Sequence, residues 1–250
     1  MTEERELRRI IGLADACELL CAATAFPDEA LAAALCDGSL VADARACLAD
    51  AQIDDTAGEA TCADWEALAG RDAATLAASL RRIHSLLHVR QADGVAVFPY
   101  ESAFRFVASG HEGEPGLFRS PVTIAVEAQM READVMPANA RTEPCDSIWN
   151  EATFLSFLLG SEAAALMEND LDAAGAWRHR AQLFIEEHLM RWLPDFLCVT
   201  AQKARALADD GLADEDAVRF RTGLSAWGAQ VARLLDDHRM LTAPSTQTSR

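Results

Sequence analysis

Apolar residues recur at three- and four-residue intervals through most of the chain, and this spacing predicts helices rather than strands. Leu7, Ile10 and Cys17 share one face of a first helix expected over residues 3–25. Further helices are expected near 27–36, 39–50, 72–89, 121–134, 147–168, 170–192, 194–209 and 213–239. The pattern therefore predicts an all-α bundle of about ten helices.

Interruptions of this pattern indicate the loops. Residues 54–58, with the sequence Asp-Asp-Thr-Ala-Gly, are expected to form a loop. Residues 93–100 break the helical period, and residues 109–121 are rich in glycine and proline.

The chain is expected to form one helical domain over residues 1–241. Within it we predict two subdomains, 1–136 and 145–241, joined near the loop at 137–144. The polar tail, residues 242–250, is expected to be disordered.

Composition supports a globular helical protein. Half of the 250 residues are apolar, and glycine and proline contribute only 13 and 8 residues. Good helix formers with few helix breakers favour an all-α fold with a real core.

The net charge is −18, from 40 acidic and 22 basic residues. This argues against nucleic acid and against stable association with an anionic membrane surface, which both favour basic proteins. An acidic surface attracts a cationic partner such as an arginine-bearing peptide, although it also serves solubility alone.

The seven cysteines are odd in number and form no C-x-x-C pair, which makes a disulfide framework or a zinc ribbon improbable. Free thiols fit a reducing cytoplasm. The acidic N-terminal residues lack a following apolar run, and no stretch of about 18 apolar residues occurs. We therefore expect neither a secretory signal nor a membrane span.

The segment Glu143-Pro144-Cys145-Asp146 precedes the most apolar of the expected helices. Asp146 or Ser147 could cap that helix, whose positive N-terminus should keep Glu143 and Asp146 ionised. Glu151 lies among apolar neighbours on the same helix, so we expect it to be half-buried and to need a partner. Guanidinium is the natural partner because its planar fork makes two parallel hydrogen bonds to a carboxylate.

An arginine of the same chain could equally supply that guanidinium. Arg105 and Arg191 are the candidates, and composition alone favours this internal pairing over a ligand.

Two further segments carry aromatic and polar residues together. His188, Trp192 and Pro194 belong to an H-L-x-x-W-x-P-x-F stretch, in which proline should kink the helix or start a new one. A lone histidine between aromatic residues is more often a core or groove residue than a ligand. Tyr100 and Glu101 follow Pro99 in a segment that suits the start of a helix.

These three segments, in this order and spacing, resemble the TorD/DmsD/NarJ family of redox-enzyme maturation chaperones. The resemblance covers roughly residues 80–240, and Ser147 stands where the family usually has histidine. It implies a cytoplasmic, all-helical protein that binds the twin-arginine leader and the apo form of a molybdenum-cofactor oxidoreductase subunit. The client would be of the dimethyl sulfoxide or trimethylamine N-oxide reductase kind, held until cofactor insertion and then released for export. The chain would then be a binding protein, a monomer or homodimer without a cofactor, and not an enzyme.

The resemblance also implies where the leader binds. Apolar parts of the leader would contact a groove lined by Phe98, Tyr100, Trp149 and Trp192, with Pro144 in the adjoining loop and His188 as a polar contact. Its arginines would face Glu101, Glu143, Asp146 and Glu151.

Two alternatives stay open. The chain could assist assembly of a leaderless, nitrate-reductase-type subunit, or it could be a guanine-nucleotide-binding enzyme. The second is weaker because no phosphate-binding loop occurs. The sequence also lacks the G-x-S-x-G elbow of serine hydrolases. His84 and His88 share a helix face, but two histidines without a third ligand are poor evidence for zinc.

Overall fold

The computed structural model describes residues 3–51, 55–92 and 94–241, and the side chains of residues 55–59 lie outside this description. The described residues form α-helices, one short 3-10 helix and no strand, which confirms the predicted all-α fold. The elements are α1 (Glu3–Thr24), α2 (Glu29–Asp37), α3 (Ser39–Asp50), α4 (Asp55–Glu66), α5 (Ala73–His88), α6 (Glu101–Ala108), α7 (Pro121–Glu132), α8 (Ile148–Met167), α9 (Leu171–Glu187), η1 (Leu189–Arg191), α10 (Leu193–Asp209) and α11 (Glu215–Arg239).

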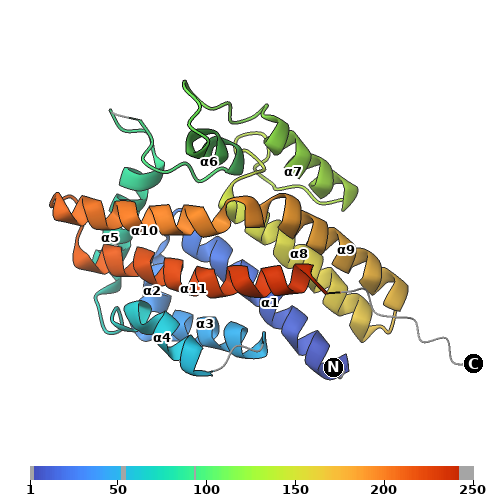
Figure 1. The fold of residues 1–250 in the computed structure, drawn as a ribbon. Helices are drawn as coiled ribbons and strands as arrows, with labels where there is room; N and C mark the ends of the chain where they lie inside the picture. Colours follow the sequence, from blue (N-terminus) through green and yellow to red (C-terminus); the bar gives the residue numbers. More distant parts are fainter. Residues whose placement is uncertain (1–2, 52–54, 93, 242–250) are drawn as a thin grey trace, which may run out of the picture.

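Two antiparallel helix pairs organise the bundle. α10 and α11 lie side by side across the front in Figure 1, and α8 and α9 form the second pair. Short connections join the helices of each pair, which is why the partners are antiparallel. α1 packs along α8 behind them, α3 and α4 lie along one edge, and α6 and α7 lie together at the opposite edge (Figure 1).

The predicted loop at residues 54–58 is wrong for the residues described, because α4 begins at Asp55; Asp54 lies outside them. Tertiary packing explains the helix. Trp65 is fully buried, and its indole N–H donates to the Phe220 carbonyl of α11 at 3.0 Å. Gly223 of α11 lets this indole approach, since a Cβ added there would lie 2.6 Å from the ring. Such packing outweighs the weak helix propensity of the first turn.

The predicted continuous helix over residues 170–192 is interrupted. α9 ends at Glu187, and His188 has φ −122° and ψ −85°, outside the helical region. The turn η1 follows, and α10 then starts with Pro194 in its first turn. The expectation that Pro194 starts a new helix is confirmed, and the break allows His188 and Trp192 to turn inward.

A network of buried charges ties four helices together. Arg178 of α9 donates to Glu162 of α8 at 2.6 Å and to Glu6 of α1 at 2.5 Å. His238 of α11 lies 3.4 Å from the second Glu162 oxygen and 3.2 Å from the Arg9 guanidinium. We call these five residues the arginine network.

Within the described ranges, no single helix is both long enough and apolar enough to cross a membrane. α1 and α2 reach the required length and composition only as a pair bent by 115°.

One buried core contains residues from Ile10 to Leu235, and α1 packs against α8 across the expected subdomain boundary. The division into residues 1–136 and 145–241 stays a prediction. The expected tail at 242–250 lies outside the described residues.

Candidate functional site

The N-termini of α6 and α8 meet, although they are far apart in the sequence. Tyr100 and Ser147 form an antiparallel bridge, the Ile148 amide donates to the Pro99 carbonyl at 3.0 Å, and the Glu101 amide donates to the Asp146 carbonyl at 2.8 Å. This backbone pairing brings four carboxyl groups to one place, those of Glu101, Glu143, Asp146 and Glu151. We call them the carboxylate junction.

Asp146 caps the neighbouring helix instead of its own. Ser147 caps α8 by accepting from the Asn150 amide at 3.3 Å, which confirms one of the two capping candidates. The Asp146 carboxylate accepts from the Ser102 amide at 2.9 Å in the first turn of α6. Asp146 therefore holds the starts of both helices together, since its carbonyl also accepts from α6.

Glu101 and Glu151 form a fully buried carboxyl pair within the junction. Glu101 accepts from Arg105 at 2.5 Å and lies 2.7 Å from His188 Nδ1. Glu151 accepts from the Trp192 indole N–H at 3.0 Å. His188 and Trp192, which flank η1, therefore each contact one carboxyl group of the pair.

Burial first, and the Glu101 charge second, raise the pKa of Glu151 well above its ordinary 4.5. Loss of hydration and a neighbouring carboxylate both disfavour the charged form of Glu151. Glu151 was expected to be half-buried, but its side chain is fully buried.

Glu143 and the Tyr100–Trp149 aromatic pair lie at the outer edge of the junction. Both rings are half-exposed and make an edge-to-face contact with centroids 6.0 Å apart. Tyr100 hydrogen-bonds to Glu143, which is also half-exposed. These three side chains form the part of the junction that solvent reaches, and we call them the rim.

The expectation that a helix N-terminus alone sets the ionisation of Glu143 and Asp146 needs correction. Burial raises the pKa of each above its ordinary value, and hydrogen bonds from Tyr100 and Ser102 only partly oppose this. Loss of hydration outweighs the helix dipole here because Asp146 is fully buried and Glu143 is half-buried.

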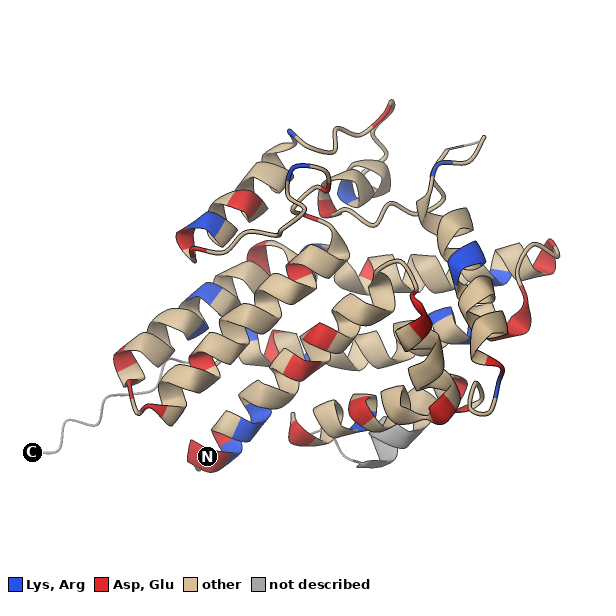
Figure 2. Ribbon diagram, turned by 180° about the vertical axis from the view of Figure 1, so that it is seen from behind, with Lys and Arg blue, Asp and Glu red and all other residues tan. Residues whose placement is uncertain are grey.

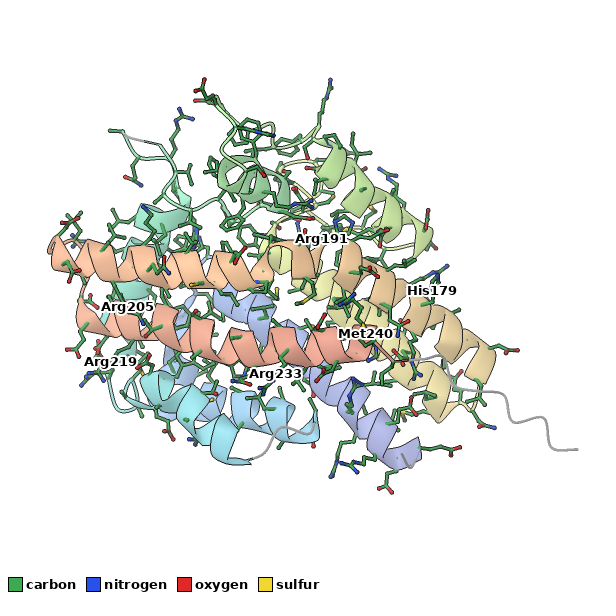
Figure 3. The ribbon with its side chains drawn as sticks, in the orientation of Figure 1. His179, Arg191, Arg205, Arg219, Arg233 and Met240 are labelled. Atoms are coloured by element: carbon green, nitrogen blue, oxygen red, sulfur yellow. The ribbon has the colours of Figure 1, made fainter. Side chains whose placement is uncertain are left out.

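The internal arginines behave differently from one another. Arg105 does pair with Glu101. Arg191, labelled in Figure 3 where α9 gives way to α10, donates to the Glu186 carbonyl at 3.0 Å and contacts none of the four carboxyl groups. Among the described residues, Arg105 is the one arginine that forms an ion pair with the junction.

The remaining predicted site residues have supporting positions. Phe98 is half-buried against the core, and Trp192 is fully buried. Pro144 is buried, and its carbonyl accepts from the Asn150 amide group at 3.1 Å. The structure thus brings the predicted residues other than Phe98 to one junction, with Trp192 beneath its surface rather than on a groove wall.

Two residues of the junction were missed in the sequence. Ser102 supplies the amide that Asp146 caps, and Gln129 of α7 lies 3.3 Å from His188 Nε2 and 2.7 Å from Glu187. Ser102 could have been identified, because it lies in the first turn of α6, where backbone amides need an acceptor. Gln129 had none, because a polar residue on a surface helix face is ordinary.

His84 and His88 of α5 are buried and contact other groups of the protein. Burial lowers the pKa of His84 to about 3, and it lowers that of His88 as well. His88 contacts the Val97 carbonyl at 2.9 Å, and His84 lies 3.2 Å from the Arg221 guanidinium. In the part of the chain that the structure describes, no group of three or more His, Cys, Asp or Glu side chains is arranged to hold a metal ion.

The model of the family described as nitrate reductase delta subunit matches residues 51–197, which include the whole carboxylate junction. The chain therefore belongs to this family, which comprises NarJ- and TorD-type chaperones of redox-enzyme maturation. It is a chaperone that assists the maturation of molybdoenzymes. No curated protein and no solved structure matches the chain significantly.

Proposed function

We propose that this protein is a cytoplasmic chaperone that binds an arginine-bearing N-terminal segment of a molybdenum-cofactor oxidoreductase subunit. It holds the apo subunit until the cofactor is inserted. The observation that carries the proposal is the charge balance of the carboxylate junction. Four carboxyl groups converge there, and within the described residues only Arg105 among the arginines is paired with them.

The junction has acceptor capacity for a guanidinium group. One carboxylate oxygen each of Glu143 and Asp146 is buried and accepts no hydrogen bond from the described residues. A buried carboxylate oxygen without a donor is costly, and a guanidinium fork offers several donors at once. Tyr100 and Trp149 provide apolar surface beside these oxygens, against which the aliphatic part of an arginine side chain can pack.

The choice between arginine and lysine tests the fork geometry. A peptide with two adjacent arginines should bind more tightly than its twin-lysine counterpart, and added salt should weaken binding because exposed charges are screened. Isothermal titration at two salt concentrations measures both effects. Equal affinity for the two peptides would contradict a site built for guanidinium.

Glu143→Gln tests the rim directly. It keeps the shape of the side chain but removes its charge, so we expect the twin-arginine peptide to bind about tenfold more weakly, as for one lost charge-assisted hydrogen bond. Asp209→Asn, at an exposed position on α10, is the matched control and should bind as the wild type does. A Glu143→Gln protein with unchanged affinity would remove Glu143 from the site.

Two kinds of client fit the family. One is a dimethyl sulfoxide or trimethylamine N-oxide reductase subunit with a twin-arginine leader, and the other is a nitrate-reductase-type subunit without one. The family description favours the nitrate-reductase-type client. The resemblance in the motifs favours the client with the twin-arginine leader to the same extent. Titration with N-terminal peptides of both kinds separates them, because only the first depends on the arginine pair. Hydrolysis of GTP well above a buffer blank would instead revive the nucleotide-handling alternative.

A further inference from the structure

A groove of about 610 Å³ runs between α1 and α8 on the face seen in Figure 2. Its apolar lining includes Ile11, Phe157 and Met167, whose side chains are 38%, 38% and 71% exposed. Large apolar side chains gathered along one groove mark a docking surface more often than isolated ones do. We call this surface the α1–α8 groove.

The α1–α8 groove leads toward the first turn of α8, where Asn150 lies next to Trp149 of the rim. Thr153 and Phe157 line both this groove and a second hollow of about 360 Å³, whose other wall is the segment that contains Met136 and Pro137. The Thr153 hydroxyl donates to the carbonyl of Trp149, one helical turn nearer the rim. From Thr153 to Met167 the groove extends about 21 Å along α8, at 1.5 Å per residue. That length accommodates a helical segment of several turns.

The charged side chains that line the α1–α8 groove are all acidic. They are Asp15 and Glu18 of α1, and both also line a neighbouring hollow with Asp43 and Asp50 of α3. Among the described residues, Arg8 pairs with Asp50 at 3.4 Å, and no ion pair involves the other three. Figure 2 shows acidic residues along the middle of α1 between α8 and α3.

These carboxylates repel one another. The pKa of Asp15 is raised by burial and then by the neighbouring charges of Glu18, Asp50 and Asp43. A cationic occupant would relieve this repulsion. A second copy of this chain, with its net charge of −18, would increase it unless it presented a basic face.

We propose that the α1–α8 groove binds the apolar helical segment that follows the arginines of the client leader, with further basic residues of the leader facing Asp15 and Glu18. This rests on the proposed function and adds to the rim a second binding surface, farther along α8. An amphipathic helix in an apolar groove with a complementary charged edge is a common mode of peptide recognition.

Gly160 offers a clean way to fill the groove. It lies on the exposed face of α8 within the groove, and a Cβ added there would have no atom within 4 Å. A side chain at this position therefore starts in open space, leucine extends it into the groove, and the better helix propensity of leucine favours the fold. Gly175 of α9 has the same open surroundings but lies outside the groove, so Gly175→Leu is the matched control.

The experiment is titration of the full-length wild type, Gly160→Leu and Gly175→Leu with one synthetic peptide, two arginines followed by an alanine- and leucine-rich helix. Circular dichroism melting checks that each variant is folded. We expect Gly160→Leu to bind at least tenfold more weakly and Gly175→Leu to bind as the wild type does. Asp15→Asn with Glu18→Gln should reduce the salt dependence of binding.

The outcomes separate this proposal from the one on which it rests. Equal binding by Gly160→Leu and wild type would overturn the groove while leaving binding at the rim intact. Failure of the wild type to bind the peptide would overturn the proposed function itself, and the groove with it. A wild-type dimer that becomes a monomer on Gly160→Leu substitution, measured by light scattering, would assign the groove to a second copy and overturn the proposal.

Discussion

The arginine network and the carboxylate junction are both buried groups of charged side chains that join distant helices, but they differ in balance. In the network, Arg178 satisfies Glu162 and Glu6 together, and Arg9 adds a second cationic group. In the junction, four carboxyl groups share one half-exposed arginine, Arg105. Buried charge is therefore not in itself a sign of function. An excess of one sign distinguishes the junction from a structural tie.

The two regions also respond differently to the cost of burial. The network offsets that cost with oppositely charged partners inside the core, whereas the junction reduces it by keeping Glu151 protonated, as the raised pKa indicates. The first solution makes each partner indispensable. The second leaves room for an external cation to change the charge state of the site.

Arg178→Met should have the largest effect of the substitutions that probe this contrast. It leaves Glu162 buried without its main partner, and breaking a buried ion pair in this way typically costs about 3–5 kcal/mol. Urea denaturation followed by circular dichroism measures the loss. Adding Glu162→Gln should recover part of it, because the uncompensated charge is then gone. A loss below about 1 kcal/mol would mean that Arg178 is not what balances the network.

Asp146→Ala should have an intermediate effect on the junction. It removes the acceptor for the Ser102 amide and exposes a gap between the starts of α6 and α8, with an expected loss of about 1–3 kcal/mol in unfolding free energy. Asp146→Asn keeps an acceptor oxygen and should lose less than half as much. If the two variants unfolded at the same denaturant concentration, the cap would contribute nothing.

Glu151→Gln should have the smallest effect at mildly acidic pH and a growing one as the pH rises. The folded state holds a proton on Glu151 that the unfolded chain releases above about 4.5, so wild-type stability falls as the pH increases from that value. Glutamine has no proton to lose, so the variant should gain relative to the wild type. The groups that face Glu151, which are Glu101, Asp146 and Trp192, are present in both proteins.

Urea unfolding at several pH values between 5 and 9 measures this difference. Parallel stability profiles for the two proteins would show that Glu151 is ionised in the folded state. On the acid side, His84 and His88 resist protonation because burial lowers their pKa values, and the resulting loss of stability below about pH 6.5 should be common to both.

Most helices could be predicted from apolar periodicity, because each buries one face against neighbours. The exceptions have tertiary causes. α4 depends on Trp65 packing against α11, and the end of α9 depends on His188 reaching a carboxylate of α6. Neither contact is visible in a local window of sequence, where each segment shows only its own propensities.

The sequence predicted that four carboxyl groups would lie together, but it did not predict which donor each of them would bind. The motifs contain all four carboxyl groups, yet Asp146 was expected at its own helix and serves α6 instead. Which carboxylate meets which donor depends on how α6 and α8 meet. The arginine network was missed altogether, although Glu162 continues the apolar stripe of Leu155 and Leu159 along α8, a position where a carboxylate signals a buried partner.

Residues 188–192 fix a length as well as a direction. His188 contacts Glu101 and Trp192 contacts Glu151, so both ends of this connection are held by the same carboxyl pair. Adding or deleting a single residue would rotate one of the two side chains away from its carboxyl group and shift α10 against α9. We therefore expect relatives of this chain to vary freely in the length of the loop at 109–120. The number of residues between α9 and α10 should stay constant, because it sets the spacing of the two helices.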